Sequence, residues 1–482
     1  MKIAFITLCI NLLCWQFAQA QTIKNAGFQS GNLTGWTFTN PAYYHQAKEP
    51  GYTVSVVKDA FRKGGYVARV SSTGHSQWGQ LKQNVVYKPT DTLEKMRLSA
   101  YVKLKDIKTG SAGMMVRALG GGSDFGISEK SLRGTTGWTY ISTEFIVPKQ
   151  TDSLLVFCSI SGAGEVLFDD IRLEKIKSLN FEQSPQARAY LDTALSIIDR
   201  YALYKDSVDF KSLIKTAHDL AIDAKKPADT YSAIQYVLKG LHDRHSFFIT
   251  PERLATDEDT TDIPMPTGKL INGNIGYVTV PSFGFFDKIL RNRFADSLHR
   301  IIKSLDSKSI AGWIVDDRNN NGGQPWPMLL GVGPLLGNGV FDKHVKKGVV
   351  IDSISYHDGA VSNKDSVIMK IGSPYSLYKP YPKVAVLINR NSASASEMVA
   401  LSFKNRPKAK LFGEPTYGIS TVPHFEDLSD GALLTVFKGR QTDRLGNEYG
   451  GKIFPDVAVS DQENTANDEV IDAAVKWLTG NN

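Results

Sequence analysis

The chain has 482 residues and a formal net charge of +7, with 42% hydrophobic and 22% charged residues. This length is enough for two or three domains and a large core, and the composition is ordinary for a globular protein rather than a disordered one. The positive charges are spread along the sequence without a basic block, so we expect no nucleic-acid partner.

The N-terminus has the features of a secretory signal peptide over residues 1–20. A short positive start at Lys2 is followed by an apolar stretch over residues 3–17 and by the small-x-small sequence AQA. We therefore expect export to the periplasm or out of the cell, and no stable membrane insertion, because the stretch is too short for a confident span. Of the three cysteines, only Cys158 lies beyond the signal, so we expect no internal disulfide.

Residues 21–175 predict an all-β domain. Short alternating or apolar runs, such as residues 52–57, 98–102 and 140–147, are separated by Gly, Asn and Pro turns. Many short strands with regular turn signals are typical of a β-sandwich.

The two ends of this domain, NAGFQSG at residues 25–31 and GEVLFDDIRL at residues 164–173, resemble the ends of galactose-binding-like jelly-roll modules. The resemblance implies carbohydrate binding, with Trp78, Tyr43 and Tyr44 as candidates for stacking on a sugar ring, because flat aromatic faces suit pyranose rings. It also makes a structural calcium ion near the domain termini a candidate ligand. The alternatives are that tryptophans such as Trp78 belong to the core, and that the domain is a scaffold without a ligand.

The remainder predicts a helical subdomain over residues 176–250 and an α/β core over residues 251–482. Apolar residues recur with helical spacing over residues 187–201, 210–224 and 231–241. From residue 274 onward, strand and helix patterns alternate, which indicates helices packed on a sheet. We expect no PDZ domain, because the segment from residue 250 to 274 is too short to hold one.

A candidate nucleophile lies in the sequence NSASASE, residues 391–397, between an apolar strand pattern and a helix pattern. Such a turn presents a serine hydroxyl beside the free N–H groups of the new helix. The alternative is that Ser394 or Ser396 only caps the helix, with Glu397 as a favourable residue of its first turn.

A serine nucleophile needs a base to take its proton, and histidine is the usual one near neutral pH. His245 is our candidate, with His242 and His424 as rivals. Gly322 and Gly323 follow a predicted strand, and their N–H groups can hold the negative oxygen of a tetrahedral intermediate together with the N–H of Ala395.

The segments DDRNNNGG (316–323), SASASE (392–397) and GEPTYG (413–418) resemble, in this order, the motifs of the C-terminal processing, or tail-specific, serine peptidases. The resemblance runs from about residue 181 to residue 478. It implies a crotonase/ClpP-like α/β core, a peptide or protein substrate, Ser394 as the nucleophile and no cofactor for catalysis.

Ile419 stands where the Ser/Lys branch of that family has its lysine, and an isoleucine side chain cannot accept a proton. The chain is more similar to the tricorn-type branch, which implies a triad of Ser394, His245 and Glu448. The functional hypothesis is an exported serine peptidase. The alternatives are a catalytically degenerate glycan- or ligand-binding protein on the same fold, and an esterase.

Overall fold

The structure is a computed structural model that describes residues 23–39, 52–59, 65–73, 78–88, 93–120, 123–176, 181–254, 263–460 and 468–480. Chain contacts divide it into two compact units. The first contains the residues up to Arg188 together with Lys215–Tyr236, and the second contains Ala189–Ile214 and the residues from Val237 onward. The expected signal peptide, Tyr43 and Tyr44 lie outside the described residues. None of the described helices is both long and apolar enough to cross a membrane.

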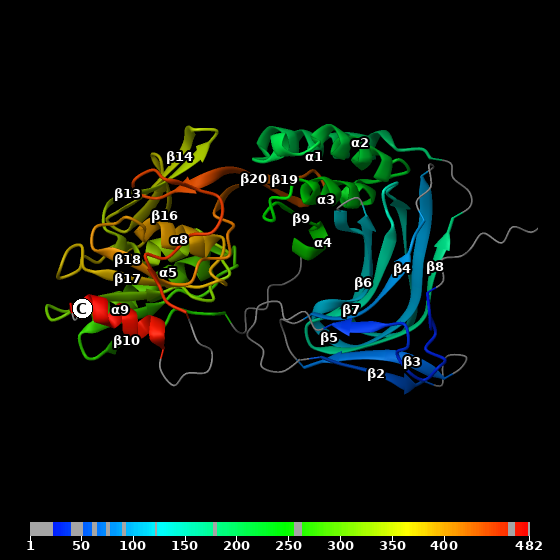
Figure 1. Cartoon of the computed structure of the whole chain (residues 1–482), viewed down its shortest axis with the longest axis horizontal. Coiled ribbons are helices and arrows are strands. Elements are labelled where there is room, and N and C mark those ends of the chain that lie inside the picture. Colours follow the sequence, from blue (N-terminus) through cyan, green and yellow to red (C-terminus); the bar gives the residue numbers. More distant parts are fainter. Residues whose placement is uncertain are drawn as a thin grey trace, which may run out of the picture. The chain divides into compact units, whose positions relative to one another are not determined.

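The first unit contains the all-β sandwich that the sequence predicts (Figure 1). Its strands have the order β1-β4-β7-β5-β8-β3-β2, and β6 pairs with β5. They are β1 (Thr37–Thr39), β2 (Tyr52–Lys58), β3 (Tyr66–Ser72), β4 (Trp78–Val86), β5 (Glu94–Gly120), β6 (Ser123–Val147), β7 (Ser153–Ser161) and β8 (Gly164–Lys175). The first part of β5 pairs with β8 and its last part pairs with β7, with register shifts along the strand. One long strand therefore contributes to both layers of the sandwich.

Large apolar side chains fill this sandwich. Phe28, Leu98 and Phe168 are fully buried. Trp36 is only 6% exposed, so this tryptophan also belongs to the core. The side chain of Trp78 lies outside the described part of the chain. Among the described residues, no group of three or more His, Cys, Asp and Glu side chains could hold a metal ion; the calcium ion stays a prediction.

Three helices follow the sandwich, as the apolar spacing predicts. They are α1 (Pro185–Tyr201), α2 (Phe210–Leu220) and α3 (Tyr231–Gly240). Helix α2 ends four residues before the predicted boundary at residue 224, where the chain enters a turn instead. The residues of these helices are divided between the two units.

The second unit is built on a six-stranded sheet with the order β10-β11-β12-β17-β18-β22. These strands are β10 (Gly268–Ile271), β11 (Ile275–Thr279), β12 (Gly312–Asp316), β17 (Val384–Ile388), β18 (Ala409–Gly413) and β22 (Val457–Ala458). Neighbours from β11 to β22 are parallel, and β10 is antiparallel to β11. This is the expected α/β core, and its mainly parallel sheet needs helices on both faces.

Alternate residues of the central strands supply two hydrophobic cores. In β17, Val384 and Val386 pack into the larger core, whereas Ala385 and Leu387 pack into the smaller one. The larger core includes residues of α5 (Lys288–Leu305), α6 (Pro325–Gly331) and α8 (Ala395–Phe403), and the smaller core includes residues of α9 (Glu469–Thr479). Figure 1 shows α9 on the opposite side of β17 and β18 from α8. The sheet is therefore covered on both faces.

A second, antiparallel sheet has the order β16-β15-β14-β13-β20-β19, with β9 and β21 also paired to β20. Its members are β9 (Phe247–Ile249), β13 (Gly339–Lys346), β14 (Val349–His357), β15 (Ala360–Asn363), β16 (Ser366–Lys370), β19 (Thr421–Asp427), β20 (Leu433–Thr442) and β21 (Glu448–Tyr449). The sequence patterns predicted part of β20 but not β13 to β16. The sheet positions the residues around the candidate base, because β9 follows that residue directly.

Candidate active site

Ser394 lies between the parallel sheet and a helix, as the sequence predicts. Strand β17 ends at Ile388 and α8 begins at Ala395. Ser394 has φ 55° and ψ −112°, a conformation that non-glycine residues adopt only when their surroundings hold them there. Ser394 and Glu397 form a capping box at the start of α8, in which each side chain faces the backbone N–H of the other residue.

The hydroxyl of Ser394 faces the side chain of His245. Ser394 Oγ lies 3.1 Å from His245 Nε2, which is hydrogen-bonding distance. The two residues are 149 positions apart in the sequence, so the fold creates this pair. Ser394 is thus more than a helix cap, because its side chain has a partner that can take a proton.

The turn that carries His245 connects α3 to β9. His242 and Arg244 both have positive φ, at 55° and 58°. The carboxylate of Asp243 accepts the backbone N–H groups of His245 at 3.0 Å and Ser246 at 2.8 Å. These bonds fix the turn from within, so Asp243 is a local cap of the turn.

The imidazole of His245 is held on its other edge and on one face. Its Nδ1 lies 2.8 Å from Thr421 Oγ1, and its ring stacks on Phe437 with 3.4 Å between the ring centroids. Burial lowers the pKa of His245 to about 3, so the ring is neutral at neutral pH. A neutral ring that donates from Nδ1 to Thr421 has a free lone pair on Nε2 for the Ser394 proton.

The rival histidines lie elsewhere. His242 is exposed. His424 stacks on Tyr201, with 3.6 Å between ring centroids, and its Nε2 lies 3.0 Å from Glu426. Among the described residues, His245 is the histidine that contacts Ser394.

The structure does not bring Glu448 to this pair. Glu448 lies in β21, and its carboxylate is 3.6 Å from Arg440. No hydrogen bond or ion pair joins it to His245 within the described part of the chain, and Thr421 occupies the Nδ1 side instead. Sequence reasoning missed Thr421, because a threonine at the start of a strand carries no motif of its own.

One proposed oxyanion donor needs correction. The N–H of Gly322 donates to Asn320 Oδ1 at 2.9 Å, so it is already used. The N–H groups of Gly323 and Ala395 have no hydrogen-bond partner among the described residues. Gly322 still has a steric role: it has φ 101°, and a Cβ there would lie 2.9 Å from the Cβ of Ser394.

Asp316 and Arg318 form an ion pair at the end of β12. Arg318 donates to both carboxylate oxygens of Asp316, at 3.0 and 2.7 Å, and to both oxygens of Asp468, at 3.1 and 2.7 Å. Asp468 is the N-cap of α9. Arg318 therefore connects the loop after β12 to the last helix.

Glu397 is a residue whose importance the sequence underestimates. It lies in the first turn of α8, as predicted, but its side chain is fully buried and its carboxylate accepts the N–H of Ser394 at 2.9 Å. A glutamate three residues after a helix start is common, so the sequence gives no sign of the burial.

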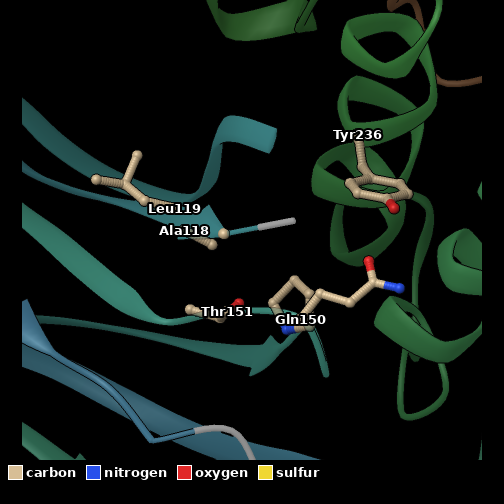
Figure 2. Close-up of a pocket in the computed structure, with 7 residues that line it drawn as sticks. Ala118, Leu119, Gln150, Thr151 and Tyr236 are labelled. Atoms are coloured by element: carbon tan, nitrogen blue, oxygen red, sulfur yellow. The ribbon is translucent and has the colours of Figure 1, made fainter. Parts of the chain in front are cut away.

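A pocket in the first unit is too small for a substrate (Figure 2). It holds about 10 Å³, roughly the space of one water molecule. Figure 2 shows Tyr236 and Gln150 directed toward each other across it, and Leu119 and Thr151 also line it. We assign it no role in the chemistry.

Residues 274–459 match the model of peptidase family S41. This range includes Ser394, Thr421 and the glycine pair, whereas His245 precedes it. The range corresponds to the α/β core that the sequence motifs indicate.

Similar proteins agree with this match. The chain is 29% identical over 294 residues to the nisin-resistance protein of Lactococcus lactis, which covers 61% of this chain and 87% of that protein. It is 29% identical over 187 residues to the carboxy-terminal processing protease CtpA of Bacillus subtilis, but this covers only 35% of that protein. Among solved structures, a lipoprotein from Streptococcus agalactiae has 25% identity and a TM-score of 0.52, covering 63% of this chain and 99% of that one.

Proposed function

We propose that the chain is a serine peptidase of the C-terminal processing type, as the match of residues 274–459 to family S41 supports, and that it cleaves peptide bonds through an acyl-enzyme on Ser394 with His245 as the base. The observation that carries this proposal is the 3.1 Å contact between Ser394 Oγ and His245 Nε2. The strained turn at Ser394 supports it, since strain of this kind clusters at active sites.

The reaction follows from the two contacts of the imidazole. Ser394 Oγ attacks the carbonyl carbon of the scissile bond while His245 Nε2 takes the hydroxyl proton. The same nitrogen then gives that proton to the leaving amine, and a water molecule hydrolyses the acyl-enzyme by the reverse sequence. Thr421 accepts from Nδ1–H and so keeps the ring in the tautomer that this step requires.

The negative oxygen of the tetrahedral intermediate needs donors that are free in the resting protein. The N–H groups of Gly323 and Ala395 meet this requirement, whereas that of Gly322 does not. Loss of one such donor typically raises the barrier by about 3 kcal/mol, so these two groups form the oxyanion hole that we propose.

The remaining parts of the hypothesis concern the first unit and the location of the protein. We propose that the sandwich binds glycan, with Trp78, Tyr43 and Tyr44 as the residues to test, and that the sequence over residues 1–20 directs export. Loss of binding to a soluble polysaccharide after Trp78→Ala would support the first part. Processing after residue 20 in a secreting host would support the second.

The test of the main proposal is Ser394→Ala. We expect loss of casein hydrolysis and of labelling by a fluorophosphonate, with the fold retained, because the variant removes the attacking oxygen and at most one helix cap. Nisin is a second peptide to assay, since it is in the name of a similar protein. Activity that survives Ser394→Ala would show that the nucleophile lies elsewhere.

A further inference from the structure

We infer that Glu397 is a positioning residue: its buried carboxylate fixes the Ser394 turn and the loop that leads to Thr421 as one unit, which keeps the serine aligned with His245. This inference rests on the proposed roles of Ser394 and His245 and extends them to a residue that does not touch the substrate.

The contacts of this carboxylate reach two separate segments. Glu397 Oε2 accepts the N–H of Ser394 at 2.9 Å and that of Ile419 at 2.9 Å. Oε1 accepts the hydroxyl of Thr416 at 2.6 Å and the N–H of Gly418 at 3.1 Å. Both oxygens are thus saturated, and three of the donors come from the loop that follows β18.

An ordinary helix-capping role does not explain this arrangement. A capping glutamate accepts the N–H at the start of its own helix, and Glu397 does so in its capping box with Ser394. Glu397 is in addition fully buried and binds a loop 19 to 22 residues further on. Burying a carboxylate is costly unless several hydrogen bonds compensate for it. Four hydrogen bonds therefore hold the buried carboxylate of Glu397 in one position.

The loop beyond Glu397 ends at the partner of the base. Ile419 and Thr421 are two residues apart, and the N–H of Thr421 donates to the carbonyl of Ile419 at 2.9 Å. Thr421 Oγ1 in turn contacts His245 Nδ1. A single carboxylate thus connects the nucleophile turn with the segment that orients the base, and a shift of about 1 Å between reacting groups can cost about 100-fold in rate.

The charge of Glu397 matters as well as its shape. Burial raises the pKa of this carboxyl, although its four hydrogen bonds oppose the rise. Asp317, at the end of β12, is a buried acid whose charge interacts with that of Glu397. A protonated carboxyl presents an O–H where a lone pair stood, so it cannot accept all four bonds. We expect acid to release the clamp.

The experiment compares kcat and KM of wild type, Glu397→Ala, Glu397→Gln and Glu397→Asp with a peptide substrate. For Glu397→Ala we expect kcat to fall by about 100-fold, with KM within about twofold of wild type, because alignment and not binding is lost. Glu397→Gln should retain more activity than Glu397→Ala, because its amide oxygen still accepts hydrogen bonds. Glu252→Gln removes an exposed carboxylate in α4 (Pro251–Leu254) and is the matched control.

The pH profile separates positioning from a merely structural role. Burial lowers the pKa of His245 to about 3, so protonation of this base does not begin until well below neutral pH. We expect wild-type kcat to fall as the pH is lowered, when the carboxylate of Glu397 takes up a proton, and we expect this acid limb to be absent in Glu397→Gln, where Asp317 is still present. An unchanged kcat in Glu397→Ala, a change in KM alone, or an acid limb that persists in Glu397→Gln would overturn the inference.

A structural readout keeps the inference separate from the proposed function. In a crystal structure of Glu397→Ala we expect Ser394 to leave its positive φ and the distance from Ser394 Oγ to His245 Nε2 to lengthen. A turn that stays in place overturns the inference even if the wild type is active. Conversely, an inactive wild type whose turn moves in the variant overturns the proposed function alone.

Discussion

The turn that carries His245 and the turn that carries Ser394 both contain residues with positive φ, and a carboxylate holds each of them. Asp243 binds N–H groups two and three residues away, at 3.0 and 2.8 Å. Glu397 binds the N–H of Ser394 and a loop about 20 residues further on. The backbone turn of the base is thus fixed by a carboxylate within the turn, whereas the turn of the nucleophile shares its carboxylate with a distant loop. Loss of the Asp243 carboxylate should therefore disturb the His245 turn alone. Loss of the Glu397 carboxylate should disturb both the Ser394 turn and the distant loop.

Thr421 tests this contrast, because it follows the loop that Glu397 binds and contacts His245. Thr421→Val removes the acceptor for His245 Nδ1–H while keeping the shape of the side chain. We expect kcat/KM to fall by about 10- to 100-fold, because the loss of one orienting hydrogen bond and of tautomer control costs about 1–3 kcal/mol. Steady-state kinetics on a peptide substrate measure it.

The controls for Thr421→Val test how the ring is oriented. Thr421→Ser keeps the hydroxyl and should restore most of the activity. Glu448→Gln tests the triad member that the sequence predicts. If Glu448→Gln lowers kcat/KM strongly while Thr421→Val is nearly silent, then a carboxylate and not the hydroxyl orients His245.

Loss of the Asp243 carboxylate should have a smaller effect. Asp243→Ala removes the acceptor of two backbone N–H groups in the His245 turn, so we expect a loss of about tenfold in kcat/KM and of roughly 1–2 kcal/mol in the free energy of unfolding. Asp243→Asn keeps one acceptor oxygen, so its losses in kcat/KM and in the free energy of unfolding should be smaller. Chemical denaturation and kinetics check these values. A loss as large as that of Glu397→Ala would remove the distinction between the two carboxylates.

The smallest expected effect concerns pH and the base itself. Since burial lowers the pKa of His245 to about 3, the folded ring stays neutral while the unfolded ring takes up a proton below its ordinary value of about 6.5. His245 therefore adds no acid limb near pH 6.5, and its contribution to stability is full above pH 6.5 and lost toward pH 3. Labelling by a fluorophosphonate in Glu397→Gln between pH 5 and 8 should be nearly flat. A limb centred near pH 6.5 would contradict this.

Much of this molecule follows from the sequence because its strongest signals are local. Runs such as residues 384–388 predict a buried strand, and the order of three motifs places Ser394 in an α/β core. The resemblance to the tricorn-type branch also implies His245 as the base. Strands β13 to β16 were not predicted, because lysines and other polar residues interrupt their apolar pattern.

The parts of the site that the sequence misses depend on contacts between distant residues. Nothing local shows that Glu397 is buried, that the N–H of Gly322 is used by Asn320, or that Thr421 meets His245. The pattern that suggested Glu448 is a loop pattern, and the structure pairs this acid with Arg440 instead. The sequence cannot distinguish a backbone N–H that already has an acceptor, such as that of Gly322, from one that has none.

The double ion pair of Arg318 has a consequence for how this enzyme tolerates cleavage of its own chain. Asp468 lies ahead of α9, and residues of that helix, such as Val470 and Leu478, are buried against the sheet. Removal of the residues from Asp468 onward would deprive Arg318 of a partner and expose the face of the sheet that α9 covers. After a cut before Asp468, the ion pair and the buried residues would be what retains the freed helix on the fold.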